Sequence, residues 1–444
     1  HIPWQTLQPN EHGDWISQRN DAFGSFISIG DKDDKTNKAT FFIPFYSNGL
    51  KTQRDAWCYN SSIGLLRKNI QTHIDFYNEQ REAFSNAGIA KKIDIKSFVE
   101  RDTTKISWTR ALEWDAEKNK LYTIGDGQFV TSYYRPFFKQ HLYFARSLNE
   151  MVYQIPKLFP NPSLKNLVIC VSASYKDGSV LITDSIPDLH FNGDTQAFPL
   201  YYYDERPKSS PTLFDTATDA STGSASGEYI RRDGVSDFIW ERAKKQYSAK
   251  NITKEDIFYY VYGFLHCPSY RETFANDLKK MLPRLPLVED VRDFWSFSNA
   301  GRKLAELHIN YEKVAPYDGV IVTGAEKLSF IDTEPDDTKL YLVEKMRFPK
   351  KGQKDTIIYN SRITIGNIPE KAYEYVVNGK SAIEWIMERY AVTTHKESGI
   401  KNDPNDWAVE VGNPRYILDL LLSIINVSVQ TVEIVEGLPE VRWE

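Results

Sequence analysis

The central part of the chain, residues 236–310, carries the clearest helical pattern and limits the fold more than any other segment. Thr253 begins a capping-box-like sequence, and the apolar residues that follow recur on one face of a helix. Pro268 ends this helix and can begin the next, which Pro283 closes, and a third helix is expected over residues 288–311. Strand-like patterns lie on both sides of the block, so the sequence predicts a mixed α+β fold.

The strand-like segments beside this block are short apolar runs bounded by turn residues. Residues 167–171 and 179–183 are two such runs, and the Lys-Asp-Gly sequence at residues 176–178 between them is typical of a hairpin turn. Further strands are expected over residues 39–46, 339–343 and 356–359, and further helices over residues 61–87, 381–387 and 415–425.

At 444 residues the chain is longer than a typical single domain, and its pattern changes divide it into parts. Residues 1–100 form a first α/β segment, and residues 101–235 form a β-rich part. This part ends in residues 205–228, whose Pro, Gly, Ser, Thr and Asp content predicts a mobile loop. Residues 236–311 are the helical block, and residues 312–444 mix strands and helices.

Charge and cysteine content constrain the class of protein. The formal net charge is −5, whereas nucleic-acid-binding domains are usually basic, although one basic face is enough for binding. The three cysteines, Cys58, Cys170 and Cys267, lie far apart, which fits a reducing cytoplasm better than a disulfide framework. No apolar run approaches the roughly 18 residues of a transmembrane helix, and no signal peptide is visible, so no membrane association and a cytoplasmic location are expected.

A search for catalytic motifs gives only weak matches. Residues 413–416, Asn-Pro-Arg-Tyr, lack the second proline of an amino-methyltransferase motif and stand where a helix cap is expected. Asp336, Asp337 and Lys339 are the residue types of a metal-dependent nuclease, but they are too close in sequence to come from two adjacent strands. A P-loop is absent, and the histidines lack metal-ligand spacing. The sequence therefore predicts no catalytic, cofactor-binding or metal site in this chain.

Three groups of basic and aromatic residues are candidates for binding DNA. They are Lys51 and Arg54 in a glycine-containing turn, Tyr133, Arg135 and Lys139 in an aromatic segment, and Lys345, Arg347, Lys350 and Lys351 in a basic cluster. A turn brings backbone N–H groups close to a phosphate. The basic cluster lies between two expected strands, so it predicts a hairpin tip that enters a major groove or follows phosphates. For the glycine-containing turn and for the basic cluster, the alternative is a run of solvated surface charges that does not bind DNA.

The aromatic segment, residues 133–144, allows two interpretations. On a regular strand, Tyr133, Arg135 and Phe137 share one face, while Tyr134, Pro136 and Phe138 point to the other. One face would then pack against the protein and the other would meet DNA. Alternatively, Arg135 satisfies a buried carboxylate and has a structural role only.

The turn at residues 48–57 and the aromatic segment together resemble the C-terminal specificity region of the bacterial Type ISP restriction–modification enzymes. Similar segments follow in order at residues 11–15, 181–190, 198–203, 256–266, 274–284 and 385–390. These enzymes join a nuclease, an ATP-driven translocase, an adenine methyltransferase and a target-recognition domain in one polypeptide. The resemblance implies that S-adenosylmethionine, ATP and Mg²⁺ act in other parts of a parent chain. The start at His1, without Met, agrees with a fragment.

The resemblance implies a target-recognition domain without enzymatic activity of its own, which binds double-stranded DNA sequence-specifically. It would position one adenine for N6 methylation by an upstream methyltransferase domain, to which residues 1–100 form the junction. A second hypothesis is a structural module that couples methyltransferase and translocase without reading bases. A third is a nuclease built on Asp336, Asp337 and Lys339. Base-pair discrimination by the isolated chain would separate the first two hypotheses.

Overall fold

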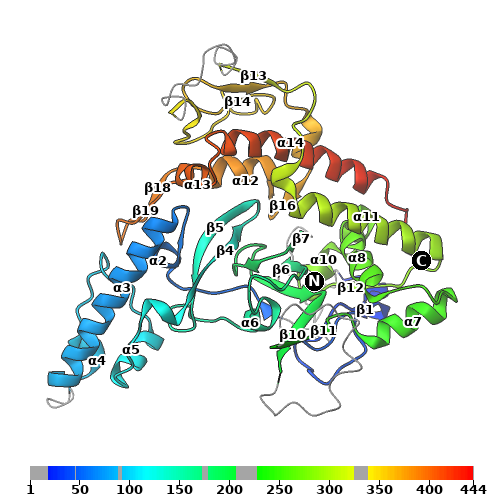
Figure 1. Cartoon of the computed structure of the whole chain (residues 1–444). Coiled ribbons are helices and arrows are strands. Elements are labelled where there is room, and N and C mark those ends of the chain that lie inside the picture. Colours follow the sequence, from blue (N-terminus) through cyan, green and yellow to red (C-terminus); the bar gives the residue numbers. More distant parts are fainter. Residues whose placement is uncertain are drawn as a thin grey trace, which may run out of the picture.

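In a computed structural model, the chain combines helices with several small sheets, which confirms the α+β prediction (Figure 1). The structure describes residues 19–45, 47–88, 93–172, 179–206, 228–324 and 339–443. Within these ranges, the larger sheets occupy the middle of the molecule, helices lie on both sides, and a small sheet stands at the top of Figure 1.

The N-terminal part is one long helix with several short elements. These are α1 (Asp21–Ser25), β1 (Ile27–Ser28), β2 (Ser47–Asn48), α2 (Asp55–Cys58), β3 (Tyr59–Asn60), α3 (Ile63–Ala83), the π-helical turn η1 (Phe84–Gly88) and α4 (Ile95–Phe98). The Ser62 side chain caps α3 by accepting a hydrogen bond from a backbone N–H of the first turn. Its buried residues, among them Leu66, Ile70 and Ile74, recur on one face. The helix predicted over residues 61–87 is therefore confirmed.

The β-rich part supplies most strands of two four-stranded sheets. Its elements are α5 (Arg110–Glu117), η2 (Ile124–Asp126), β4 (Gln128–Arg135), β5 (Phe138–Phe144), α6 (Ile155–Leu158), β6 (Val168–Ser172), β7 (Val180–Thr183), β8 (Ile186–Pro187), β9 (Thr195–Pro199), β10 (Tyr201–Glu205) and β11 (Tyr229–Asp233). The sheet orders are β3-β5-β4-β8 and β2-β9-β6-β7. The antiparallel pair β6–β7 confirms two predicted strands. Residues 173–178, with the predicted hairpin turn, and 207–227, most of the predicted mobile loop, lie outside the described residues.

The sheet that contains β6 separates two hydrophobic cores. Val168 and Cys170 of β6 belong to one core, and Ile169 and Val171 belong to the other, because successive side chains of a strand point to opposite faces. The first core also contains α3 and the β4–β5 hairpin, whereas the second contains the helical block. A strand buried on both faces has no polar alternation, which explains the continuous apolar run in the sequence.

The helical block contains the predicted helices with shifted bounds. Its elements are α7 (Asp237–Tyr247), α8 (Lys254–Phe264), α9 (Pro268–Thr273), α10 (Ala275–Leu278), β12 (Arg284–Leu285), α11 (Val291–Ile309) and η3 (Tyr311–Lys313). The capping box at Thr253 is confirmed, since its hydroxyl accepts from Asp256 N and the Asp256 carboxylate accepts from Thr253 N. The helix expected between Pro268 and Pro283 is interrupted at Phe274, which separates α9 from α10.

Helices α8 and α11 pack with their backbones close together. A Cβ atom added at Gly263 of α8 would lie 2.1 Å from the carbonyl oxygen of Phe297 in α11. A Cβ atom added at Gly301 of α11 would lie 1.9 Å from the carbonyl oxygen of Tyr259. Glycine is therefore required at both positions for this approach.

The C-terminal part places a three-stranded sheet above a pair of core helices (Figure 1). Its elements are β13 (Ile321–Thr323), β14 (Ile357–Ile358), β15 (Thr364–Gly366), η6 (Glu370–Tyr373), β16 (Val376–Val377), β17 (Lys380–Ser381), α12 (Ala382–Arg389), β18 (Thr393–Thr394), β19 (Lys401–Asn402), α13 (Pro404–Glu410) and α14 (Tyr416–Glu436). Helix α14 is apolar and long enough to cross a membrane, with a mean hydropathy of 1.6 over 18 residues, so the expectation of no such segment is corrected. Yet 72% of that window is buried, as in a core helix.

Two predicted strands are wrong. In the described residues 39–45 of the strand predicted over 39–46, one β-bridge forms, between Phe42 and Val235, because the N–H groups of this segment bond to different parts of the chain. Residues 339–343 begin with a 3-10 turn. The carbonyl groups of Leu340 and Leu342 accept hydrogen bonds from the Asn360 side chain and are therefore not available to a strand partner.

Candidate nucleic-acid interface

The β4–β5 hairpin places the aromatic segment in the middle of the molecule (Figure 1). Pro136 and Phe137 form its turn, and Phe137 has a left-handed backbone with φ of 57°. The strand register shifts between Tyr133 and Arg135, so a bulge interrupts the alternation of side chains. The prediction that residues 133–138 form one regular strand is therefore wrong.

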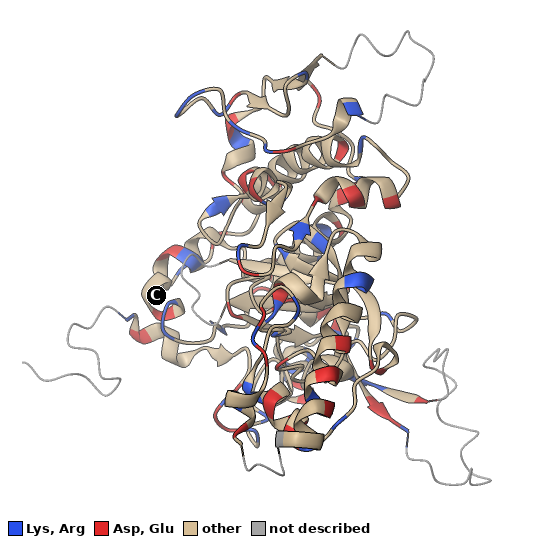
Figure 2. Ribbon diagram, turned by 90° about the vertical axis from the view of Figure 1, so that its left-hand side faces the viewer, with Lys and Arg blue, Asp and Glu red and all other residues tan. Residues whose placement is uncertain are grey.

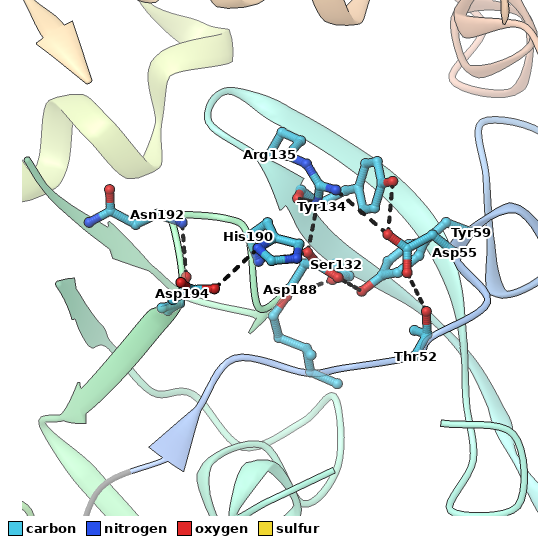
Figure 3. Close-up of polar contacts among 12 residues, drawn as sticks. Thr52, Asp55, Tyr59, Ser132, Tyr134, Arg135, Asp188, His190, Asn192 and Asp194 are labelled. Atoms are coloured by element: carbon cyan, nitrogen blue, oxygen red, sulfur yellow. Dashed lines mark hydrogen bonds and ion pairs between the residues drawn. The ribbon is translucent and has the colours of Figure 1, made fainter. Parts of the chain in front are cut away.

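Arg135 is held between two carboxylates inside the protein (Figure 3). Its Nη1 donates a hydrogen bond to Asp188 Oδ1 at 2.7 Å, and its Nη2 lies 3.6 Å from Asp55 Oδ2. The side chains of Arg135 and Asp188 are 12% and 2% exposed. The guanidinium also lies 3.8 Å from the centroid of the Tyr134 ring. These contacts match the second interpretation of the segment, in which Arg135 satisfies a buried carboxylate.

The same carboxylates connect the hairpin to the first residue of α2 and to β3 (Figure 3). The hydroxyl of Tyr59 donates to Asp188 at 3.1 Å, and the hydroxyl of Tyr134 donates to Asp55 at 3.0 Å. Burial raises the pKa of Asp188 to about 7, and the Arg135 guanidinium opposes this shift. The network thus fixes the position of the loop that carries the first group of candidate residues.

Arg54 anchors this loop from within. The residue is 4% exposed, and its guanidinium donates hydrogen bonds to the Leu148 carbonyl and, at 2.8 Å, to the Thr109 hydroxyl. Burial lowers the pKa of Arg54, and its Nε atom is buried without a hydrogen-bond partner among the residues that the structure describes. Because the guanidinium is buried, the predicted phosphate contact is corrected to a structural role.

Two further candidates also have internal partners. Tyr133 is 2% exposed and packs against the Phe191 ring at 5.3 Å between centroids. The Lys139 ammonium lies 2.6 Å from Glu312 and over the Tyr133 ring at 5.0 Å. Burial therefore corrects the role of Tyr133 to internal packing, whereas a DNA contact by Lys139, whose side chain is paired but 15% exposed, stays a prediction. Lys51 differs, because it is partly exposed and its ammonium has no ion-pair partner in the described ranges.

The basic loop, residues 345–354, lies in the upper part of the molecule, where Figure 2 shows Lys and Arg on several loops. Its exposed cations are Lys345, Arg347, Lys350, Lys351 and Lys354. An isolated antiparallel bridge between Arg347 and Ile358 closes the loop, so the predicted hairpin exists in reduced form. Lys354 pairs with Glu384 at 3.0 Å. The other four cations have no ion-pair partner among the residues that the structure describes.

A cleft of about 540 Å³ opens beside the carboxylate network. Its walls are the loop at the start of α2, the β4–β5 hairpin and the β18–β19 tip, residues 393–397. Gln53 is exposed on one wall and has a left-handed backbone with φ of 57°. Asn402 of β19 accepts hydrogen bonds from Gln140 of β5 at 2.9 Å and from the Ser61 N–H at 2.8 Å. The walls are therefore tied together at their base.

The two segments that weakly match catalytic motifs differ in how far the structure describes them. The Asn413 side chain accepts a hydrogen bond from Arg415 N at 3.0 Å in the turn before α14. The N-cap of α14 is Arg415, which makes no side-chain cap bond, so the prediction that Asn413 is the N-cap is wrong. Asp336 and Asp337 lie outside the described residues, so the nuclease hypothesis stays a prediction. Within the described ranges, no group of three or more His, Cys, Asp or Glu side chains is arranged to hold a metal ion.

A family model described as the Type ISP C-terminal specificity domain matches residues 41–420 of the chain. The chain belongs to this family. The match includes the hairpin, the basic loop and all three walls of the cleft, and it confirms the resemblance seen in the sequence.

Solved structures of DNA-bound enzymes share the fold of this specificity domain. A structure described as the ATP-dependent Type ISP restriction–modification enzyme LlaBIII bound to DNA is 36% identical, with a TM-score of 0.80 over 99% of this chain and 26% of that chain. A nuclease-deletion mutant of the Type ISP enzyme LlaGI with a DNA substrate mimic is 36% identical, with a TM-score of 0.79 over 99% and 31% of the two chains.

A third structure, the DrdV–DNA complex, is 27% identical, with a TM-score of 0.78 over 99% of this chain and 40% of that chain. This specificity domain therefore spans only about a quarter to two fifths of the length of these relatives. No curated protein sequence matched the chain.

Sequence reasoning located the basic loop of this specificity domain but missed the cleft. Gln53 lies in the glycine-containing turn, but the residue types of this turn indicate Lys51 and Arg54 as the DNA-binding candidates. The opposite wall, residues 393–397, carries no recognisable motif and comes from the other end of the chain. Only the fold brings these two segments to one cleft.

Proposed function

We propose that this chain recognises target sequences in double-stranded DNA as part of a longer Type ISP polypeptide. The basic loop is the observation that carries the proposal, because Lys345, Arg347, Lys350 and Lys351 are exposed and unpaired among the described residues. Such cations bind phosphates by releasing counterions, independently of sequence. The structures of similar proteins with DNA or a DNA substrate mimic support DNA as the ligand.

Recognition would serve to place one adenine in the site of an upstream methyltransferase domain of the same polypeptide. S-adenosylmethionine, ATP and Mg²⁺ would then act outside this chain, whose own residues bind and orient the duplex. The small share of the relatives' length that this chain covers supports such a division of roles.

The experiment replaces two lysines of the basic loop, Lys350→Ala and Lys351→Ala, in one variant. Affinity should fall alike for all duplexes, because phosphate contacts carry no sequence information. The slope of log affinity against log salt should decrease by about 1 for each lost contact. Fluorescence anisotropy titrations of two unrelated duplexes across a salt series measure both quantities.

The matched control is Lys32→Ala with Lys35→Ala, since both lysines are exposed on the loop between β1 and β2. This control should bind and respond to salt like the unchanged protein. Equal affinity and equal salt slope for the two double variants would remove the basic loop from the DNA interface.

A further inference from the structure

We infer that the cleft reads base edges, with Gln53 and the β18–β19 tip as its specificity-determining elements. This inference rests on the proposed recognition of DNA and goes beyond it, because it separates the residues that choose a sequence from those that hold phosphates. Four properties of the cleft carry the inference: the exposed hydrogen-bonding groups at its rim, its balanced charge, the backbone conformation of Gln53, and the hydrogen bonds that hold its walls.

The first observation is that the rim of the cleft has unused hydrogen-bonding groups. Gln53, Thr393 and Thr394 are exposed, and their side chains have no hydrogen-bond partner in the described part of the chain. Amides and hydroxyls both donate and accept hydrogen bonds. Base edges in the major groove present donors and acceptors in a pattern that identifies each base pair, so these groups suit direct readout.

The second observation is the charge of the cleft. The charged residues that line it are Arg54, Arg389, Lys396, Asp55, Glu388 and Glu397, so cations and anions are equal in number. A surface that held phosphates would have an excess of cations, as the basic loop does. The balanced charge therefore favours contact with bases at the cleft, while the basic loop supplies the phosphate contacts.

The third observation is the backbone of Gln53. A left-handed conformation is uncommon for a glutamine and strains the backbone, whereas glycine adopts it freely. Such strain persists where the surrounding structure imposes it, and it is frequent at ligand-binding positions. A glutamine in this strained position is consistent with a role of its side-chain amide in ligand binding.

The fourth observation is that hydrogen bonds hold the two walls that carry these groups, the loop of Gln53 and the β18–β19 tip. The neighbours of Gln53 are fixed, since Thr52 donates a hydrogen bond to Asp55 and Arg54 is anchored to Leu148. On the opposite side, Asn402 ties the tip to β5. Side chains that discriminate bases must be held in place by such contacts, because a loosely held group adapts to the wrong base.

The decisive variant is Gln53→Gly. It removes the amide and also relieves the left-handed strain, so thermal stability should stay equal or increase. Ser248→Gly is the matched control, because Ser248 is also exposed and left-handed, with φ of 50°, but caps α7 outside the cleft. Thr394→Val is a second cleft variant that removes a hydroxyl with little change of shape.

The measurement is selection of preferred sites from a randomised duplex pool, followed by anisotropy titrations of the selected duplex and its single-base-pair variants. Gln53→Gly or Thr394→Val should lose discrimination at one or two positions by about 5-fold to 150-fold and keep its affinity for unselected duplexes. Ser248→Gly should select the same site as the unchanged protein.

Two results would overturn the inference and are distinguishable. If both cleft variants keep the original preference at every position, base reading lies elsewhere, although the proposed function stands. If the unchanged protein selects no site at all, the proposed function fails and the inference fails with it.

Discussion

Arg135 and Asp188 illustrate, at the scale of single residues, why an arginine beside aromatic rings need not contact DNA. Removal of one partner from a buried ion pair leaves the other charge uncompensated in a poorly solvated place. We therefore predict that Arg135→Met lowers the free energy of unfolding by about 3–5 kcal/mol. Urea unfolding followed by fluorescence measures this change, and Arg135→Met with Asp188→Asn should recover part of it.

Arg232→Met provides the control for a surface pair. Arg232 lies 2.7 Å from Asp204, the same distance as in the buried pair, but their side chains are 50% and 31% exposed. Loss of such a pair costs about 1 kcal/mol or less. If Arg135→Met were no more destabilising than Arg232→Met, the structural role of Arg135 would be contradicted.

The residues of the candidate site differ in how far the sequence could place them. The exposed position of Lys350 and Lys351 can be predicted from the sequence, because a proline and a glycine beside them indicate a turn. The role of Arg135 depends on Asp188, which follows a different strand and comes beneath the hairpin only in the folded chain. The cleft position of Gln53 likewise depends on a hairpin from the far end of the chain.

At the scale of elements, two buried histidines lie where α8, α11 and α14 meet. The ring of His308 in α11 makes two hydrogen bonds. Its Nδ1 lies 2.6 Å from the Tyr262 hydroxyl, and its Nε2 lies 2.9 Å from the Thr431 hydroxyl of α14. The ring of His266, which follows α8, lies 5.7 Å from that of His308. Burial lowers the pKa of His266 from its ordinary value near 6.5 to about 4, so the folded protein keeps this ring neutral.

Protonation of His266 should therefore destabilise this junction in acid. The unfolded chain binds a proton at His266 below about pH 6.5, whereas the folded chain does so only near pH 4. Unfolding thus takes up a proton between these values, and stability falls as the pH falls through them, by roughly 2 kcal/mol from pH 7 to pH 5. Urea unfolding at both pH values should show a smaller difference for His266→Asn. If the free energy of unfolding of His266→Asn changed between pH 7 and pH 5 as much as that of the unchanged protein, His266 would not be the group responsible.

Helices were predicted better than strands because their signals are local. Ser62 and Thr253 cap α3 and α8 within the segments that show the helical period. Strands depend on partners elsewhere, and the described residues 39–45 and 339–343 lack continuous strand partners despite suitable composition. The strands β6 and β7 were predicted correctly because they are neighbours in sequence and pair with each other.

At the scale of the whole molecule, the net charge of −5 agrees with one basic surface on an otherwise acidic protein. Many basic residues pair with carboxylates, such as Arg302 with Asp256 at 2.7 Å. Those of the basic loop are mostly unpaired among the described residues. In our proposal, affinity comes from this loop and sequence choice from the cleft, which explains how an acidic chain can bind DNA.

The most direct test is a cryo-electron microscopy structure of the chain, or of the polypeptide that contains it, with a duplex that it selects. Our account predicts phosphates against Lys350 and Lys351 of the basic loop, and base edges within hydrogen-bond distance of Gln53 or the β18–β19 tip. A duplex bound on another surface, with the basic loop and the cleft both remote from it, would contradict the account.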